Sequence, residues 1–278
     1  QHALAAAGGT ADVSALSLVG SGHTIVLLDH RGAVLGPCPM GVQSPRAASH
    51  LITTVGTSTL VHRVGHIPSK DTPVALLRWW CQENPTAAPR LAAAPLLHEW
   101  LAWRLRGDSD LAALVTDRSS ASLTGWFDPV RAVWDNEVLA LATDQPIRLP
   151  RVLLPGEDAG RGPGGLAVAP GASLRGAATL GLALRPGDTV LDLGGQGSAF
   201  AVVGRALAAA VPEVAVMADA QARLLCITPS GAGAVQLAAA AATLGLDGEQ
   251  LAQEAMAAGA GFGGMEFDVT TGSLRGTL

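Results

Sequence analysis

A glycine-rich turn between two apolar runs is the part of the sequence that points most directly to chemistry. The segment TVLDLGGQGSAFAVVG (189–204) places Gly194, Gly195 and Gly197 around Gln196. Glycines at such a turn allow backbone N–H groups to surround a phosphate, but they equally allow a plain hairpin turn. A dinucleotide-binding turn leads from a strand into a helix, whereas SAFAVVG has the character of a strand. The sequence therefore predicts a hairpin and leaves phosphate binding open.

Two histidines in the segment HRVGH form a second candidate group. His62 and His66 stand four residues apart, a spacing that on a helix can hold a metal ion. Gly65 and Pro68 oppose a helix here, and no carboxylate completes a ligand set. We therefore expect loop histidines and assign no metal ligand.

The elements that must position these residues alternate between strand and helix. Strands are predicted at VSALSLVG (13–20) and HTIVLLD (23–29), and a loop rich in proline and glycine at 36–45. This alternation indicates an α/β fold. Glycine and proline concentrate in 153–171, where we predict a boundary between domains 1–163 and 164–278. Apolar periodicity and end signals predict helices within 72–85, 93–107, 134–142, 233–246 and 247–259, with a further helix ending near Leu184.

Composition limits the classes of function. The chain has 278 residues, 49% of them hydrophobic, and a net charge of −5, which argues against nucleic-acid binding. Its three cysteines, Cys38, Cys81 and Cys226, lack metal-ligand spacing and indicate reduced thiols in a cytoplasmic protein. No apolar run reaches the ~18 residues of a membrane span, so we expect no membrane association.

Several segments, in order along the chain, resemble the FGGY family of carbohydrate kinases. GSGHTIVLLDHRGAVLGP (20–37) is similar to the family's substrate-side segment, LVTDRSSASLTGWFDP (114–129) to its middle region, and LGLALRPGDTVLDLGGQGSAF (180–200) to a helix, strand and phosphate loop. MADAQARLLCI (217–227) resembles xylulokinases. The resemblance implies an actin-like (ribonuclease H-like) ATPase fold whose two lobes hold sugar and ATP between them. It also implies ATP and Mg²⁺ as cofactors, and transfer of a phosphoryl group to D-xylulose or a related ketose.

The sequence departs from the family at the residues that carry catalysis. The family's general base is an Asp at the start of the helix before RPGD, and that position falls on Ser173 or Leu174. Neither side chain accepts a proton at neutral pH, so the catalytic residue is unknown. Gln43 stands where the family's sugar-binding loop has an Asp, and Gly195 and Gln196 replace hydroxyl residues of its phosphate loop.

The resemblance nevertheless implies a set of binding residues. His23 and Gln43 would line the sugar site, although His23 fits a structural role at a strand end equally well. Phosphate would meet the turn at Gly194, Gly195, Gln196 and Gly197. Asp192 resembles the Mg²⁺-linked Asp of other actin-like ATPases, and its plainer explanation is a charged residue at a strand end.

Further expectations concern completeness and assembly. The family's first phosphate loop and adenosine loop would lie outside 1–278, so we expect each lobe to be incomplete and this chain alone to be an inactive or incomplete kinase. The alternative is a non-catalytic sugar-binding or interaction protein on a kinase-derived scaffold. VSALSLVG is apolar, as in a buried central strand. Because an open apolar edge recruits strands, we expect a second copy, a second chain or the N-terminal tail to cover it.

Overall fold

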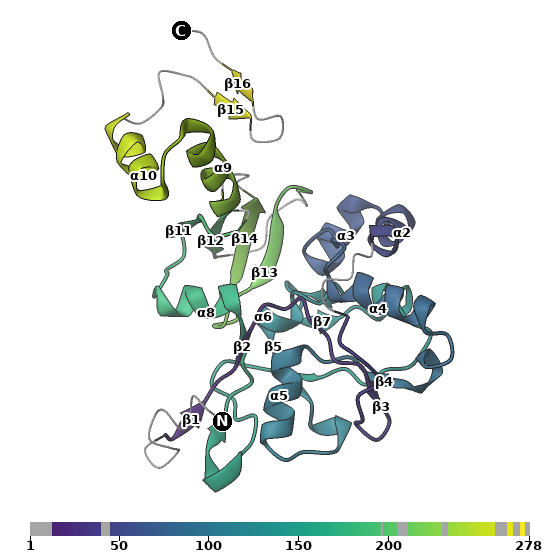
Figure 1. Ribbon diagram of the computed structural model, residues 1–278. Coiled ribbons are helices and arrows are strands. Elements are labelled where there is room, and N and C mark those ends of the chain that lie inside the picture. The colour runs from purple at the N-terminus through teal and green to yellow at the C-terminus, as the bar shows by residue number, and fades with distance from the viewer. Residues whose placement is uncertain are drawn as a thin grey trace. The chain divides into compact units, whose positions relative to one another are not determined.

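The computed structural model describes residues 13–39, 45–195, 197–204, 211–229 and 233–258, together with the strands at 266–268 and 273–275 (Figure 1). Contacts group the chain into two compact units. The first unit is Gln1–Pro186 with Val202–Cys226, and the second is Gly187–Ala201 with Ile227–Leu278. This grouping does not test the boundary between family lobes at 163 and 164, which stays a prediction.

The first unit begins with two short pairs of parallel strands. β1 (Ala15–Leu16) pairs with β9 (Ala167–Val168), and β2 (Val19–Gly20) pairs with β10 (Ala172–Ser173). The predicted strand VSALSLVG therefore forms in two pieces, each with one neighbouring strand in the described part of the chain. The prediction that both its faces are buried is wrong, since Val19 is 46% exposed. Successive side chains of a strand point to opposite faces of its sheet, and the face that carries Val19 is open to solvent.

Three further strand pairs lie in the first unit. β3 (Leu28–Asp29) pairs antiparallel with β4 (Leu91–Ala93), and β6 (Phe127–Asp128) with β7 (Val133–Trp134). β5 (Val115–Asp117) pairs parallel with β8 (Arg151–Leu153). The predicted strand HTIVLLD contracts to β3 and an isolated bridge between Ile25 and Leu96.

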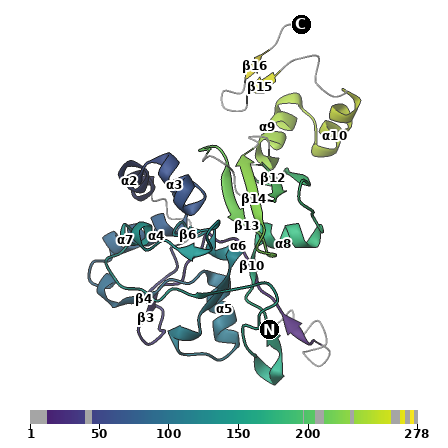
Figure 2. The ribbon, with the colours of Figure 1, turned by 180° about the vertical axis from the view of Figure 1, so that it is seen from behind.

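Seven α-helices are described in the first unit. They are α2 (Pro45–Val55), α3 (Thr57–Val64), α4 (Pro73–Glu83), α5 (Leu97–Leu105), α6 (Arg118–Ala121), α7 (Asn136–Ala140) and α8 (Leu174–Gly181). Three short 3₁₀ helices join them: η1 (Ala88–Arg90), η2 (Leu111–Ala113) and η3 (Pro163–Gly165). The sequence predicts α4, α5, α7 and α8 but not α2 and α3. These two are rich in Ser, Thr and His, which have weak helix propensity, and they pack against each other while α2 also packs on α4 (Figure 2).

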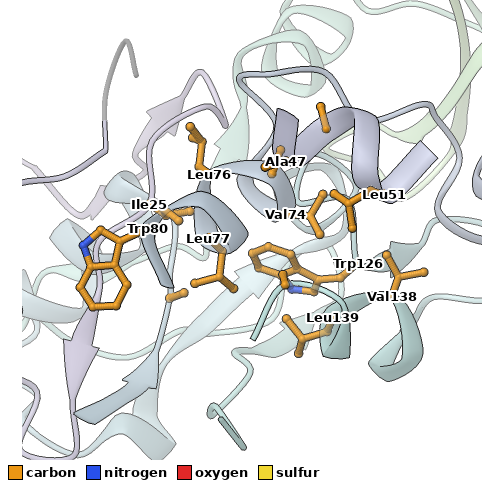
Figure 3. Close-up of a cluster of buried hydrophobic side chains, with 14 of the residues drawn as sticks. Ile25, Ala47, Leu51, Val74, Leu76, Leu77, Trp80, Trp126, Val138 and Leu139 are labelled. Atoms are coloured by element: carbon orange, nitrogen blue, oxygen red, sulfur yellow. The ribbon is translucent and has the colours of Figure 1, made fainter. Parts of the chain in front are cut away.

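The main hydrophobic core lies where these helices meet. Leu51 of α2 and Val74 of α4 are fully buried, and Figure 3 shows both beside the indole of Trp126. Val138 and Leu139 of α7 lie on the other sides of that ring. A second cluster gathers around Trp103 and includes Val26, Leu28, Ala93 and Leu114. Burial of these aromatic and branched side chains supplies most of the driving force for folding.

The second unit contains a hairpin and two helices. β11 (Thr189–Asp192) pairs antiparallel with the start of β12 (Ser198–Val203), from Thr189 opposite Ala201 to Asp192 opposite Ser198. α9 (Ala234–Leu244) and α10 (Gly248–Ala257) follow, then the pair β15 (Glu266–Asp268) and β16 (Ser273–Arg275). β13 (Ala215–Ala218) belongs to the first unit and is hydrogen-bonded to β14 (Leu224–Pro229), which continues into the second.

Candidate functional site

At the carboxyl ends of β2 and β10, the structure places the predicted sugar-site residue His23 and the predicted base position Ser173 at one edge. Gly20 lies opposite Ser173, and the strands run parallel. His23 follows Gly20 by three residues and is exposed, while α8 begins directly after Ser173. In parallel α/β sheets, ligands bind outside the carboxyl ends of the strands. His23 and the start of α8 therefore define the candidate site.

Ser173 has a structural task at this edge. Its hydroxyl oxygen accepts a hydrogen bond from the Gly176 N–H at 3.0 Å, which caps the N-terminus of α8. The Ser173 N–H donates to Ser119 Oγ at 2.9 Å, and the residue is 3% exposed. Leu174, the alternative position for the family's base, is 65% exposed on the first turn of α8. Neither residue brings a carboxylate to the edge.

The short helix α6 connects the elements of the site, and it was not predicted from the sequence. Asp117 caps this helix by accepting from the N–H groups of Ser119 and Ser120, at 2.8 and 3.0 Å. Ser122 Oγ accepts from the Ala218 N–H at 3.1 Å, which ties α6 to β13. An Asp followed by serines at the start of a helix is a recognisable capping signal, so the segment TDRSSAS could have been predicted.

Two buried ionisable residues at the start of α5 lie close to this edge: His98 lies against β2, and Glu99 is hydrogen-bonded to Thr116 of β5. His98 Nε2 is hydrogen-bonded to Ser120 Oγ at 2.9 Å, and a Cβ at Gly20 would lie 2.2 Å from His98 Nδ1. Burial lowers the pKa of His98 to about 4. Glu99 accepts from the Leu96 N–H at 2.8 Å and from the Thr116 hydroxyl, yet burial raises its pKa to about 8. At neutral pH the imidazole is therefore uncharged and the carboxyl mostly protonated.

Of the two histidines in HRVGH, His66 is buried near His23, whereas His62 is exposed to solvent. Burial lowers the pKa of His66 to about 4, with a smaller contribution from the nearby charge of His23. His66 Nδ1 donates to the Val64 carbonyl at 3.1 Å, because a carbonyl only accepts, and this leaves Nε2 as the acceptor of the neutral ring. His62 is exposed on α3, so its prediction as a loop residue is wrong; the helix runs to Val64 before ending at Gly65. In the described part of the chain no group of three metal-ligating side chains forms.

The glycine turn forms the predicted hairpin. The Gly197 N–H donates to the Gly194 carbonyl at 2.7 Å, and the Gly194 N–H donates to Asp192 Oδ1 at 2.9 Å. These two donors are used within the turn. The first turn of α9 lies beside it, since the Val235 N–H points to the Gly195 carbonyl at 3.4 Å. A helix N-terminus favours a phosphate. Gln43 and Gln196 lie outside the described residues.

A cavity of about 500 Å³ opens beside α8 in the first unit. Val19, Leu154 and Leu180 give it an apolar wall, and Asp117 and Asp219 contribute polar groups. The Asp219 carboxylate is already paired with Arg223, at 2.6 Å. Val19 of β2 and Ala172 of β10 also line it, so the cavity adjoins the same strand pair, although neither His23 nor Ser173 is among its described lining residues.

Comparison with known proteins agrees with this architecture. A model of the N-terminal domain of the FGGY family of carbohydrate kinases matches residues 5–174. The xylulose kinase of Streptomyces coelicolor is 36% identical over 249 residues, and that of Streptomyces rubiginosus 33%. Each match covers 86% of this chain and 51% of the relative, so the chain spans about half the length of these curated relatives.

Solved structures give the same result. The crystal structure of xylulose kinase from Bifidobacterium adolescentis matches with a TM-score of 0.87 and 27% identity, over 99% of this chain and 66% of that one. Plasmodium falciparum glycerol kinase, at 12% identity and a TM-score of 0.70, shows likeness of fold alone. The predicted α/β, actin-like fold is confirmed. Within the described ranges, the helices are too short or too polar to span a bilayer.

Proposed function

The chain belongs to the FGGY family of carbohydrate kinases, and on that basis we propose that it is a xylulokinase-type protein that binds a ketose such as D-xylulose. The observation that carries the proposal is the edge where β2 and β10 end, with His23 beyond one strand and the start of α8 at the other. The 36% identity to a xylulose kinase supports the choice of sugar. His23, with Gln43, is proposed to contact the sugar hydroxyls.

We further propose that this chain alone does not phosphorylate the sugar. A general base contributes typically ~10²–10⁴-fold to a rate, and the family's base position carries Ser173 or Leu174. A serine hydroxyl does not accept a proton at neutral pH and a leucine side chain cannot, so the Ser173 hydroxyl serves only as the cap of α8. The alternative, a non-catalytic sugar-binding or interaction protein, rests on this same feature.

ATP and Mg²⁺ are part of the proposal because of the family. The residues that would hold the phosphates are Gly194, Gly195, Gln196 and Gly197, next to the first turn of α9. Bound there, ATP would supply the phosphoryl group and Mg²⁺ would neutralise its charge. The hairpin offers fewer donors than a fully open loop, since the N–H groups of Gly194 and Gly197 bond within the turn.

An ADP-release assay with D-xylulose and a calorimetric titration with the same sugar separate these possibilities. We expect no sugar-dependent turnover and a measurable heat of binding that His23→Ala reduces. His50→Ala is the matched control, because His50 is exposed on α2. Turnover of about 1 s⁻¹, the low end of ordinary enzyme rates, would overturn the claim of inactivity. Absence of heat at millimolar sugar would favour the interaction protein.

Assembly and location belong to the proposal as well. β1 and β2 each have one neighbouring strand in the described part of the chain, and we propose that a second copy or another chain covers their open side. Size-exclusion chromatography with light scattering tests the first option, and a stable monomer would remove it. A cytoplasmic setting, inferred from the reduced cysteines, stays a prediction.

A further inference from the structure

Three arginine side chains surround one small cavity in the first unit, at the C-terminal end of α5. The cavity has a volume of about 260 Å³, and Arg106, Arg151 and Arg161 line it. We call this group the arginine notch. Asp108 is the one acidic residue among its described lining residues, and the Asp158 carboxylate lies 3.1 Å from Arg161 Nη2. Three cations face two carboxylates, so the notch keeps an excess positive charge in a chain that is acidic overall.

The guanidinium of Arg106 is buried and incompletely paired. Its side chain is 3% exposed, Nε donates to Asp108 Oδ2 at 2.7 Å, and Nη2 donates to the Ala113 carbonyl at 2.7 Å. Nη1 is buried and has no hydrogen-bond partner among the described residues. A buried donor without an acceptor is unfavourable, so an acceptor oxygen placed next to this nitrogen would stabilise the site.

The surrounding backbone holds the notch in place. Arg151 opens β8 opposite Val115, and the Gly160 carbonyl accepts from the Val168 N–H at 2.9 Å. A Cβ at Gly160 would stand 2.7 Å from Arg106 Cδ, so the chain passes directly over that side chain. Arg151 and Arg161 are exposed, and their guanidinium groups can turn toward a ligand without unfolding the site.

From this arrangement we propose that the arginine notch binds a phosphate group, either free phosphate or the phosphate of a small monoester. The planar guanidinium fork matches phosphate oxygens in pairs, which a single ammonium does not. The volume exceeds the ~30 Å³ share of one water molecule several-fold, enough for a phosphate and its waters. The proposal does not rest on the proposed function, since the notch uses neither the edge at His23 nor the glycine turn.

Isothermal titration calorimetry with inorganic phosphate tests the proposal, using the whole chain and chloride to match ionic strength. We expect saturable binding that Arg151→Gln and Arg161→Gln each weaken by about tenfold or more. Both side chains are exposed, so these variants should fold. Arg131→Gln is the matched control, because Arg131 is 74% exposed and lies outside the notch.

Glycerol phosphate, as a second probe, distinguishes the two sources of the phosphate group. Tighter binding of glycerol phosphate than of inorganic phosphate indicates a monoester, and equal or weaker binding indicates the free ion. Two results would overturn the proposal. One is the absence of saturable heat with both probes; the other is phosphate binding that survives unchanged in both notch variants, which would place it elsewhere, for example at the glycine turn.

Discussion

Replacing Gly65 by alanine should destabilise the first unit, because this glycine lies where the end of α3 meets β13. Its φ is +81°, and a Cβ would stand 2.0 Å from the Val216 carbonyl oxygen. The left-handed conformation alone costs alanine ~1–2 kcal/mol. Relieving the contact requires the backbones to separate, which strains the 2.6 Å hydrogen bond from the Val216 N–H to the Gly65 carbonyl, worth ~0.5–1.5 kcal/mol. We expect Gly65→Ala to lower the free energy of unfolding by about 1.5–3.5 kcal/mol.

Gly107→Ala is the matched control for this substitution. Gly107 also has a positive φ, +77°, directly after a helix, but no heavy atom lies within 4 Å of a Cβ built there. It therefore bears the conformational cost without the steric one. Urea unfolding followed by circular dichroism should show Gly65→Ala losing ~0.5–1.5 kcal/mol more than Gly107→Ala. Equal losses in the two variants would refute the argument that Gly65 is required by its contact with β13.

Three further predictions concern polar groups that are buried or partly buried. Burial raises the pKa of Glu99 to about 8, so its contribution to stability is complete below its ordinary pKa of 4.5 and is lost as the pH rises toward 8. Burial lowers the pKa values of His66 and His98 to about 4, so their contribution is complete above pH 6.5 and is lost as the pH falls toward 4. The free energy of unfolding should therefore peak near pH 6.5 and decline above that pH by ~1.4 kcal/mol per pH unit in urea titrations. Glu99→Gln should abolish this decline, and a decline that persists in the variant would contradict the prediction. Ser173→Ala should cost ~0.5–2 kcal/mol through loss of the helix cap, and unchanged thermal unfolding would argue against that role. Asp135→Ala should cost ~2–4 kcal/mol, since it removes both a cap and a 2.6 Å ion pair, while Asp135→Asn, which keeps a capping oxygen, should cost less; equal losses would exclude a contribution from the cap.

Local signals predicted the helices that carry them. α4 begins with a proline at its first position, and α5 ends just before Gly107, both signals that depend on a few neighbouring residues. The hairpin at Gly194 to Gly197 likewise follows from glycines between two apolar runs, and its strands pair as predicted. α2 was not predicted because its Ser, Thr and His residues have weak helix propensity. Its apolar residues Ala47, Ala48 and Leu51 nevertheless recur at helical spacing and are buried, so this pattern could have indicated the helix.

The candidate site was less predictable than the fold. His23 and the position of Ser173 came from resemblance to a family, and the register of β2 and β10 places them at one edge. The connections made by α6 join Ser119 to Ser173 and Ser122 to Ala218, pairs separated by 54 and 96 residues. Hydrogen bonds over such separations leave no periodic pattern in a single sequence, so they emerge only from the folded chain.

Serine at position 173 meets the requirement of folding, a helix cap, but not the requirement of phosphoryl transfer, a general base. Serine and aspartate are about equally good helix caps, so either residue can start α8 and satisfy the Gly176 N–H. Only aspartate could also take a proton from a sugar hydroxyl at neutral pH. A change between the two at this position therefore alters acid–base chemistry while leaving the cap intact. Stability measurements cannot distinguish a kinase from a non-catalytic relative here, and the ADP-release assay, read together with sugar binding at His23, is the measurement that does.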